Sequence, residues 1–512
     1  MNKKKGLFFR FLGSVEKIGN ALPHPVTIFL VLCAVIAVVS HIAYLVGASV
    51  TYSGINPSTL ETGEITVKAT SLLTGDGIRY IFTSAVSNFT GFAPLGTVLV
   101  AMLGVGVAEG TGLISSLLKK LVLSTPKTLI TVIVVFAGVM SNIASDAGYV
   151  VLVPLGAIIF ASVGRHPLAG LAAAFAGVSG GFSANLLVGT IDPLLGGIST
   201  EAAKMIDPSI AVGPTANFYF MFVSTFLITI LGTLITHKIV EPRLGEYKGK
   251  HIEKLDKITS EEKRGLRFSL VALLIFIAVM LVLLVPANGI LRDQTTGEIL
   301  GHSPFMNSIV FIIGLLFLIP GIGYGIGAGT VKNDKDVERF MSKAMASMGS
   351  YLVLSFIASQ FVAYFSYTKL GTILAVKGAE ALKAAGITGI GLILLFILLT
   401  AFINLFMASA SAKWAIMAPV FVPMFMKMGL SADLTQVAYR IADSSTNIIT
   451  PLMSYFAFIV AFAAKYDEDA GIGTLISTMV PYSIIFLVGW SIMLVIWYFL
   501  GLPLGPGAGL FY

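Results

Sequence analysis

The chain has 512 residues, of which 56% are hydrophobic and only 12% are charged. Soluble globular proteins carry about 25% charged residues, so 33 basic and 26 acidic side chains are too few to cover a water-facing surface of this size. The composition excludes a soluble enzyme and a disordered chain, and the single cysteine excludes a disulfide scaffold. It is typical of an all-α polytopic membrane protein.

Nine hydrophobic stretches are long enough to cross a bilayer, for which about 20 apolar residues suffice. The first has no acidic or basic residue and is longer than the roughly 7–15 residues of a signal-peptide core, so we expect an anchored helix. The nine predicted spans are residues 26–46, 90–118, 167–197, 216–238, 266–287, 303–326, 348–368, 435–464 and 476–501.

Two further hydrophobic segments, 127–162 and 386–428, are each divided by a short polar stretch, at 141–148 and 408–414 respectively. One interpretation is a re-entrant hairpin, which a bilayer tolerates only where the tip is buried in protein or lines water. The other interpretation is two ordinary helices joined by a tight polar turn. Hydropathy alone favours neither.

The distribution of lysine and arginine favours the hairpins. With both segments re-entrant, the predicted cytoplasmic loops hold 23 basic residues and the external loops hold 7, in agreement with the positive-inside rule. This topology places the N-terminus in the cytoplasm and the C-terminus outside. Membrane orientation therefore accounts for the net charge of +7, and no nucleic-acid partner is expected.

The chain divides into two related halves, each with a hairpin followed by a span that has a polar break. The connector between them is expected to be a solvated linker or, alternatively, an interfacial helix along anionic lipid. The predicted boundaries are 1–238 for the first half (hairpin 127–162, broken helix 167–197), 239–265 for the cytoplasmic connector, and 266–512 for an extra span plus the second half (hairpin 386–428, broken helix 435–464).

Four asparagines relate the two halves. Asn142 in the first hairpin break precedes Asn185 in the following broken span by 43 residues, and Asn404 precedes Asn447 by the same interval. The first hairpin would enter the membrane from the inside and the second from the outside. This arrangement is typical of an inverted repeat, in which discontinuous helices build a site near the bilayer midplane.

Charged residues beside the breaks are the first candidates for binding. Asp192 follows a glycine-rich break, and a carboxylate within a membrane indicates function by default; alternatively, it caps the external end of its span. Arg440 and Asp443 are three residues apart and share a helix face that Pro451 later interrupts. Arginine suits a substrate carboxylate through a bidentate pair, although an internal ion pair between Arg440 and Asp443 is the alternative.

Polar residues at the hairpin breaks add further candidates. Trp414 would stack on an aromatic ligand or serve as an interfacial tryptophan, and Lys413 would take part in proton coupling or extend toward water. Side-chain oxygens near the breaks suit a hard cation such as Na⁺. They belong to Ser141, Asn142, Asn185, Asn404 and Asn447. No nucleotide-binding or metal-cluster motif occurs, so neither ATP nor another cofactor is expected.

Three segments, 141–156, 408–424 and 439–455, resemble the AbgT family of bacterial p-aminobenzoyl-glutamate transporters, whose close relatives export sulfonamide antimetabolites. The likeness extends from residue 20 to the last helix. It implies nine transmembrane helices plus two opposed re-entrant hairpins, a homodimer, and a fold like that of the ion-transporter superfamily.

The resemblance also implies roles for particular residues. The family's acidic residue after the first break falls on Asp192. Its other site residues fall on Asn404, Ser411, Trp414, Arg440, Asp443 and Pro451. The sequence departs from the family at Ala432, Ala442 and Ser454, where proline, glycine and proline are usual. These changes affect helix flexibility and substrate preference and leave the charged set intact.

The sequence therefore predicts a secondary active transporter, not an enzyme, in the bacterial inner (cytoplasmic) membrane. It would carry p-aminobenzoyl-glutamate or a related small aromatic anion together with Na⁺ or H⁺. In this hypothesis Arg440 pairs with the glutamate carboxylate and Trp414 packs on the ring. The residues expected to couple an ion are Asn142, Asn185, Asp192, Asp443 and Asn447. The alternatives are a proton-driven sulfonamide efflux pump and, from another class, a passive channel.

Overall fold

The computed structural model describes residues 23, 25–55, 62–123, 126–144, 148–247, 258–299, 303–407, 409–453, 455–467 and 470–512. The basic N-terminal stretch, the middle of the predicted connector, and the predicted hairpin-tip residues Ser145 and Asp146 lie outside the described residues, as does Ser454.

The first half is mainly helical. It comprises α2 (Pro25–Leu45), β1 (Ser49–Ile55), β2 (Thr62–Lys68), α3 (Gly75–Thr90), α4 (Ala93–Gly110), α5 (Leu113–Leu123), η1 (Lys127–Leu129), α6 (Ile130–Ser141), η2 (Asn142–Ala144), η3 (Gly148–Leu152), α7 (Val153–Ser162), α8 (Pro167–Phe175), η4 (Ala176–Gly180), α9 (Ile191–Ala203), α10 (Phe218–Ile235), η5 (Thr236–Val240) and α11 (Glu241–Leu244).

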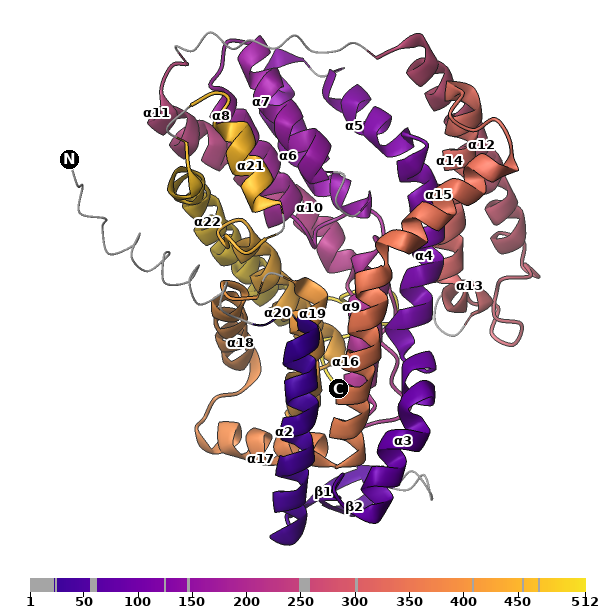
Figure 1. Ribbon diagram of the computed structural model, residues 1–512, viewed down its shortest axis with the longest axis vertical. Helices are drawn as coiled ribbons and strands as arrows, with labels where there is room; N and C mark the ends of the chain where they lie inside the picture. The colour runs from indigo at the N-terminus through magenta and orange to yellow at the C-terminus, as the bar shows by residue number, and fades with distance from the viewer. Residues whose placement is uncertain are drawn as a thin grey trace, which may run out of the picture.

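In the second half, the regular elements among the described residues are helices. It comprises α12 (Ser260–Leu284), α13 (Pro304–Asn307), α14 (Ile309–Ala328), α15 (Asp334–Ser347), α16 (Gly349–Tyr367), α17 (Leu370–Ala384), α18 (Gly389–Asn404), α19 (Ala410–Met426), α20 (Ala432–Asn447), α21 (Phe456–Ala463) and α22 (Ile472–Phe499). In Figure 1, α12, α13 and α14 form a column on one side of the molecule, next to α4 and α15.

Within the described ranges, seven helices are long and apolar enough to cross a membrane, or eight if the bent pair α17 and α18 is one span. Both predicted hairpins and both predicted broken spans are interrupted in the structure. The first hairpin breaks after α6, the first broken span after η4, the second hairpin after α18 and the second broken span after α20. The multi-span helical class is therefore confirmed, whereas the count of nine spans with two re-entrant hairpins stays a prediction.

Three details differ from the sequence-based expectations. The predicted external loop 47–89 contains a two-stranded antiparallel sheet, in which Ser49 pairs with Lys68, so the fold is not strictly all-α. The same loop contains α3, and the predicted span 90–118 instead runs over α3 and α4 as residues 75–110. The loop predicted at 369–385 is the helix α17, bent by 115° from α18.

Amphipathic sequences explain the two unexpected helices. Hydropathy predicts a loop at α17 because the segment carries lysines. In the structure, Ile373, Val376 and Ala379 are buried, and α17 packs against β1 and α19. In α3, Asp76 and Arg79 form an exposed ion pair one turn apart, which lowers the hydropathy without disfavouring a helix. Such helices need only one apolar face.

The interrupted elements pack at the centre of the fold. Every residue of α8 is buried, and α6, α7 and η4 all contact it. In the second half, α20 contacts α18, α19 and α22. Helix α20 also contacts η4 of the first half, and α9 contacts α19, α20 and α4, the helix that lies next to the column of Figure 1.

The crossing of α4 and α14 gives a first prediction. A Cβ at Gly104 would lie 1.9 Å from the carbonyl oxygen of Gly314, whereas a Cβ at Gly96, on the same helix, would meet nothing within 4 Å. We expect Gly104→Ala to force the helices apart at a cost of roughly 1–3 kcal/mol and to lower the melting temperature of the purified protein. Gly96→Ala should be neutral or slightly stabilising, because alanine favours a helix interior; equal melting temperatures for the two variants would contradict this packing.

Candidate functional site

Helix α20 supplies most of the candidate site. It begins after Ser431, whose hydroxyl oxygen accepts a hydrogen bond from the amide of Leu434 at 3.0 Å. Fifteen of its 16 residues are buried, although the helix is rich in charged and polar side chains. Because buried charges are expensive unless they are paired, the partners of these side chains determine what the helix can do.

Two buried ion pairs join α20 to neighbouring elements. Arg440 Nη2 lies 2.7 Å from Asp192 Oδ1, in the first turn of α9. Lys413 Nζ, in the first turn of α19, lies 2.6 Å from Asp443 Oδ1. The alternative of an Arg440–Asp443 pair is therefore wrong. The alternative in which Lys413 extends toward water is also wrong, because its side chain is 0% exposed.

The Arg440–Asp192 pair connects the two broken spans. Arg440 Nη2 also donates to the carbonyl oxygen of Ser183 at 3.1 Å, within the break after η4. Asp192 Oδ2 accepts from the amide of Gly189 at 2.6 Å, in the break that precedes α9, and this bond does not cap the helix. Arg440 Nε is buried and has no hydrogen-bond partner among the described residues. This Nε–H donor of the guanidinium is thus unsatisfied within the described structure.

Asn404 organises the break of the second hairpin. Its Nδ2 donates to the carbonyl oxygen of Asp443 at 2.9 Å, to Thr446 Oγ1 at 2.8 Å and to Asn447 Oδ1 at 2.9 Å. Its Oδ1 accepts a hydrogen bond from Lys413 Nζ. All five side chains are buried. The end of α18, the start of α19 and the end of α20 are thereby held in one polar network.

The first half repeats part of this network. Asn142 Nδ2 donates to the carbonyl oxygen of Gly181 at 3.3 Å, across 39 residues. The bond from Asn404 to the carbonyl oxygen of Asp443 also spans 39 residues. Asn142 Oδ1 is buried and accepts no hydrogen bond from the described part of the chain. Each hairpin asparagine thus donates to a carbonyl oxygen 39 residues further on, which supports the internal repeat that the asparagine spacing indicates.

Trp414 lies in a separate polar cluster. Its indole Nε1 donates to Ser199 Oγ at 2.9 Å, and its ring centroid is 4.5 Å from that of Tyr439. Ser199 donates to Gln436 Oε1 at 2.6 Å, and Gln436 donates to Asn217 Oδ1 at 2.8 Å. Trp414 is 0% exposed, so protein covers its ring in this conformation.

The remaining predicted residues line the breaks. Ser411 is half-buried in the first turn of α19, and Pro451 is half-buried in the break after α20. Asn185, in the break after η4, is buried and accepts from the amide of Leu187 at 3.2 Å. Asn447 Nδ2 donates to Asp443 Oδ2 at 3.3 Å. Sequence reasoning missed Ser199, Gln436 and Asn217, because single neutral polar side chains on separate elements give no signal until their partners are known.

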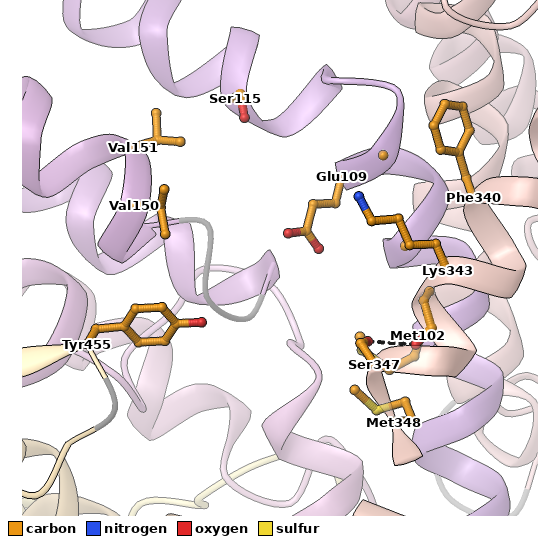
Figure 2. Close-up of a pocket in the computed structure, with 13 residues that line it drawn as sticks. Met102, Glu109, Ser115, Val150, Val151, Phe340, Lys343, Ser347, Met348 and Tyr455 are labelled. Carbon is orange, nitrogen blue, oxygen red and sulfur yellow. Dashed lines mark hydrogen bonds between the residues drawn. The ribbon is translucent and has the colours of Figure 1, made fainter. Parts of the chain in front are cut away.

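A cavity of about 540 Å³ lies between helices α4 and α15 on one side and the first hairpin on the other. Figure 2 shows Glu109 of α4 and Lys343 of α15 pointing into it from one side, with the Tyr455 hydroxyl on the opposite side. Tyr455 directly precedes α21, and its ring stacks on that of Tyr149 with centroids 4.9 Å apart. Both charged side chains are exposed, so the cavity combines ionic groups with an aromatic wall.

The oxygen donors at the first hairpin break fit a hard cation. In addition to Asn142 Oδ1, Ser141 Oγ is buried and uses its proton on the carbonyl oxygen of Gly138 at 2.6 Å, which leaves its lone pairs directed elsewhere. Among the described residues there is no group of three or more His, Cys, Asp or Glu side chains placed to hold a metal. Neutral oxygens of this kind suit a monovalent or other hard ion better than a transition metal.

Buried ion pairs at the interruptions of paired helices, inside a bundle of membrane spans, define a membrane transport protein. The chain belongs to the AbgT family: the model of the AbgT putative transporter family matches residues 10–512.

Characterised relatives agree with this assignment. The p-aminobenzoyl-glutamate transport protein of Escherichia coli K12 is 41% identical over 498 residues, which is 97% of this chain and 96% of that protein. The crystal structure of the Alcanivorax borkumensis YdaH transporter matches with a TM-score of 0.88 at 48% identity, covering 94% of this chain and 100% of that one. The Neisseria gonorrhoeae MtrF structure, described as illuminating a class of antimetabolite efflux pumps, matches with a TM-score of 0.91 at 50% identity, covering 98% and 100%.

Proposed function

We propose that the protein is a secondary active transporter of p-aminobenzoyl-glutamate or a related aromatic carboxylate, coupled to Na⁺ or H⁺. The observation that carries the proposal is Arg440, a buried guanidinium that uses Nη2 on Asp192 and Ser183 while Nε has no partner among the described residues. A carboxylate that reached Nε would satisfy this buried donor with a charge-assisted hydrogen bond. The name of the Escherichia coli relative supplies the substrate class.

The site would respond to a substrate carboxylate through competition for Arg440. A substrate anion and Asp192 both require the guanidinium, and Asp192 has a second hydrogen bond, to the amide of Gly189, that can hold it in place. Substrate binding would therefore loosen the link between the broken spans. We propose that Ser411, Pro451 and the Trp414 ring complete the substrate site once the hairpins move. Movement of the hairpin domains against a dimeric scaffold is part of the proposal.

The cavity of Figure 2 would connect the substrate site with the cytoplasm. In the proposed topology, with the N-terminus cytoplasmic and the C-terminus external, α15 lies on the cytoplasmic side. Lys343 would attract an anion into the cavity, and the stacked Tyr149 and Tyr455 rings would offer an aromatic wall to its ring. Its volume is within the range of small-molecule sites.

Ion coupling would use groups on both sides of the substrate site. We propose that Na⁺ is held by the oxygens of Ser141, Asn142 and Asn185 in the first half, and that Asp192 and Asp443, with Asn447, respond to the ion that drives transport. A homodimer in the bacterial inner membrane completes the proposed assembly.

The test uses purified protein in liposomes with labelled p-aminobenzoyl-glutamate outside. Uptake is followed under a Na⁺ gradient alone, a pH gradient alone, and no gradient. Uptake that rises with one gradient supports coupled import and identifies the ion. Absence of uptake under every gradient would contradict the proposed substrate or direction.

Proton-driven efflux of antimetabolites is the second candidate, because MtrF is 50% identical over 98% of this chain. Sulfonamide movement driven by a pH gradient, without p-aminobenzoyl-glutamate uptake, would favour it. A passive channel would show neither saturation nor counterflow, whereas either transporter would show both.

A further inference from the structure

Matching positions in the two halves differ in charge. Nine residues after the hairpin asparagine, the first half has Val151 and the second has Lys413; 39 residues after it, the first half has Gly181 and the second has Asp443. The register is fixed by the asparagines, each of which donates to the carbonyl oxygen 39 residues further on. The second half thus carries an ion pair where the first carries a valine and a glycine.

The Lys413 ammonium is bound by two side-chain oxygens. It donates to Asn404 Oδ1 and, at 2.6 Å, to Asp443 Oδ1, and its side chain is 0% exposed. It also lies in the first turn of α19, where the helix dipole disfavours a cation. A lysine held there without water therefore depends on these oxygens. In the first half, the oxygen that matches Asn404 Oδ1 is Asn142 Oδ1, which has no partner among the described residues.

We propose that the Lys413 ammonium is a tethered cation, which takes in the second half the place that an inorganic cation would otherwise occupy between Asn404 and Asp443. The inference rests on the proposed ion-coupled transport and refines it. The inorganic coupling cation then belongs to the first half, at Asn142. Because a side chain cannot dissociate, the second half has no inorganic cation to exchange, and only the first half responds to the concentration of an inorganic cation.

The geometry allows a cation to replace the ammonium. Hard cations hold oxygen ligands at roughly 2.3–2.6 Å, close to the 2.6 Å between Lys413 Nζ and Asp443 Oδ1. Truncating the lysine at Cβ would leave a buried space lined by Asn404 Oδ1 and an unneutralised Asp443 carboxylate. Such a space should bind Na⁺, and the wild-type protein should lack it.

The experiment measures Na⁺ binding to the purified protein in detergent, by melting temperature in sodium or choline chloride at equal ionic strength and by radioactive sodium at equilibrium. We expect Lys413→Ala to bind about one more Na⁺ per chain than the wild type, and Na⁺ to raise its melting temperature by roughly 5 °C more. An identical Na⁺ response in the folded variant and the wild type would overturn the proposal.

Two further variants make each outcome decisive. Lys413→Ala/Asp443→Asn lacks the carboxylate and should not gain the extra ion, and Lys383→Ala, which removes an exposed lysine of α17, should behave as the wild type. Recovery of Lys413→Ala by Na⁺ but not choline during purification would also support the proposal. If Lys413→Ala does not fold in either sodium or choline chloride while the double variant folds normally, the lysine only neutralises Asp443. Because the readout is cation binding, a lack of wild-type uptake would contradict the proposed function and not this inference.

Discussion

Replacing Arg440 by alanine is expected to slow uptake of p-aminobenzoyl-glutamate by at least about 100-fold at low substrate concentration. Truncating one partner of a buried, hydrogen-bonded charge pair typically costs about 2–5 kcal/mol, and Arg440 is 1% exposed and paired with Asp192 at 2.7 Å. The substrate loses its carboxylate partner, and the two broken spans lose the link between them. Initial uptake into liposomes measures the effect.

Two controls separate binding from folding. Arg440→Lys keeps a positive charge near Asp192 but lacks the planar fork, so it should preserve the melting temperature and still weaken substrate affinity. Arg243→Ala, which removes an exposed arginine that donates to the carbonyl oxygen of Ser477, should change uptake less than about 2-fold. Normal uptake by Arg440→Ala would show that the carboxylate role is wrong, and retained drug efflux in that variant would favour the efflux pump.

Replacing Asp443 by alanine is expected to abolish uptake and to lower the melting temperature by roughly 10 °C. The change leaves the Lys413 ammonium in a buried site without its carboxylate, and breaking a buried pair from one side costs about 3–5 kcal/mol. Asn447 Nδ2 also loses its bond to Asp443 Oδ2. Thermal melting monitored by size-exclusion chromatography measures the stability, and liposome uptake measures the transport.

A matched variant distinguishes the two effects of Asp443. Lys413→Met/Asp443→Leu replaces the pair with apolar side chains of similar length, a change that is often neutral or stabilising in a protein interior. We expect this double variant to melt close to the wild-type temperature and still to show no uptake. If Asp443→Ala alone melts like the wild type, the Lys413–Asp443 pair does not have the energetic role that its burial indicates.

The sequence predicted the interrupted architecture because polar and glycine-rich stretches within long apolar segments have few structural solutions in a bilayer. The interval of 43 residues between Asn142 and Asn185, repeated between Asn404 and Asn447, identified the breaks. The structure adds the equal 39-residue bonds at the two hairpins. Helix α20 begins three residues before the predicted start at residue 435, because Ser431 caps the helix before the hydropathy rises.

Pairing of the charges could not be predicted from the sequence. Helical periodicity places Arg440 and Asp443 three residues apart, but it does not determine which neighbouring helix each side chain meets. The structure places Arg440 against α9 and Asp443 against α19. The sequence alone therefore allows two interpretations of Lys413, because its partner Asp443 is 30 residues away in sequence and on another helix.

Helix α20 also has a consequence for how the protein is made. A translocon releases helices into lipid one after another when they are apolar enough, and each central aspartate or arginine opposes this by about 2.5–3.5 kcal/mol. Helix α20 carries Arg440 and Asp443 near its middle and is buried along almost its whole length against α18, α19 and α22. Of these neighbours, α22 is the last to be synthesised. We therefore expect helix α20 to enter the membrane as part of an assembled group, and a nascent chain should acquire its final topology after residues 472–499 have left the ribosome.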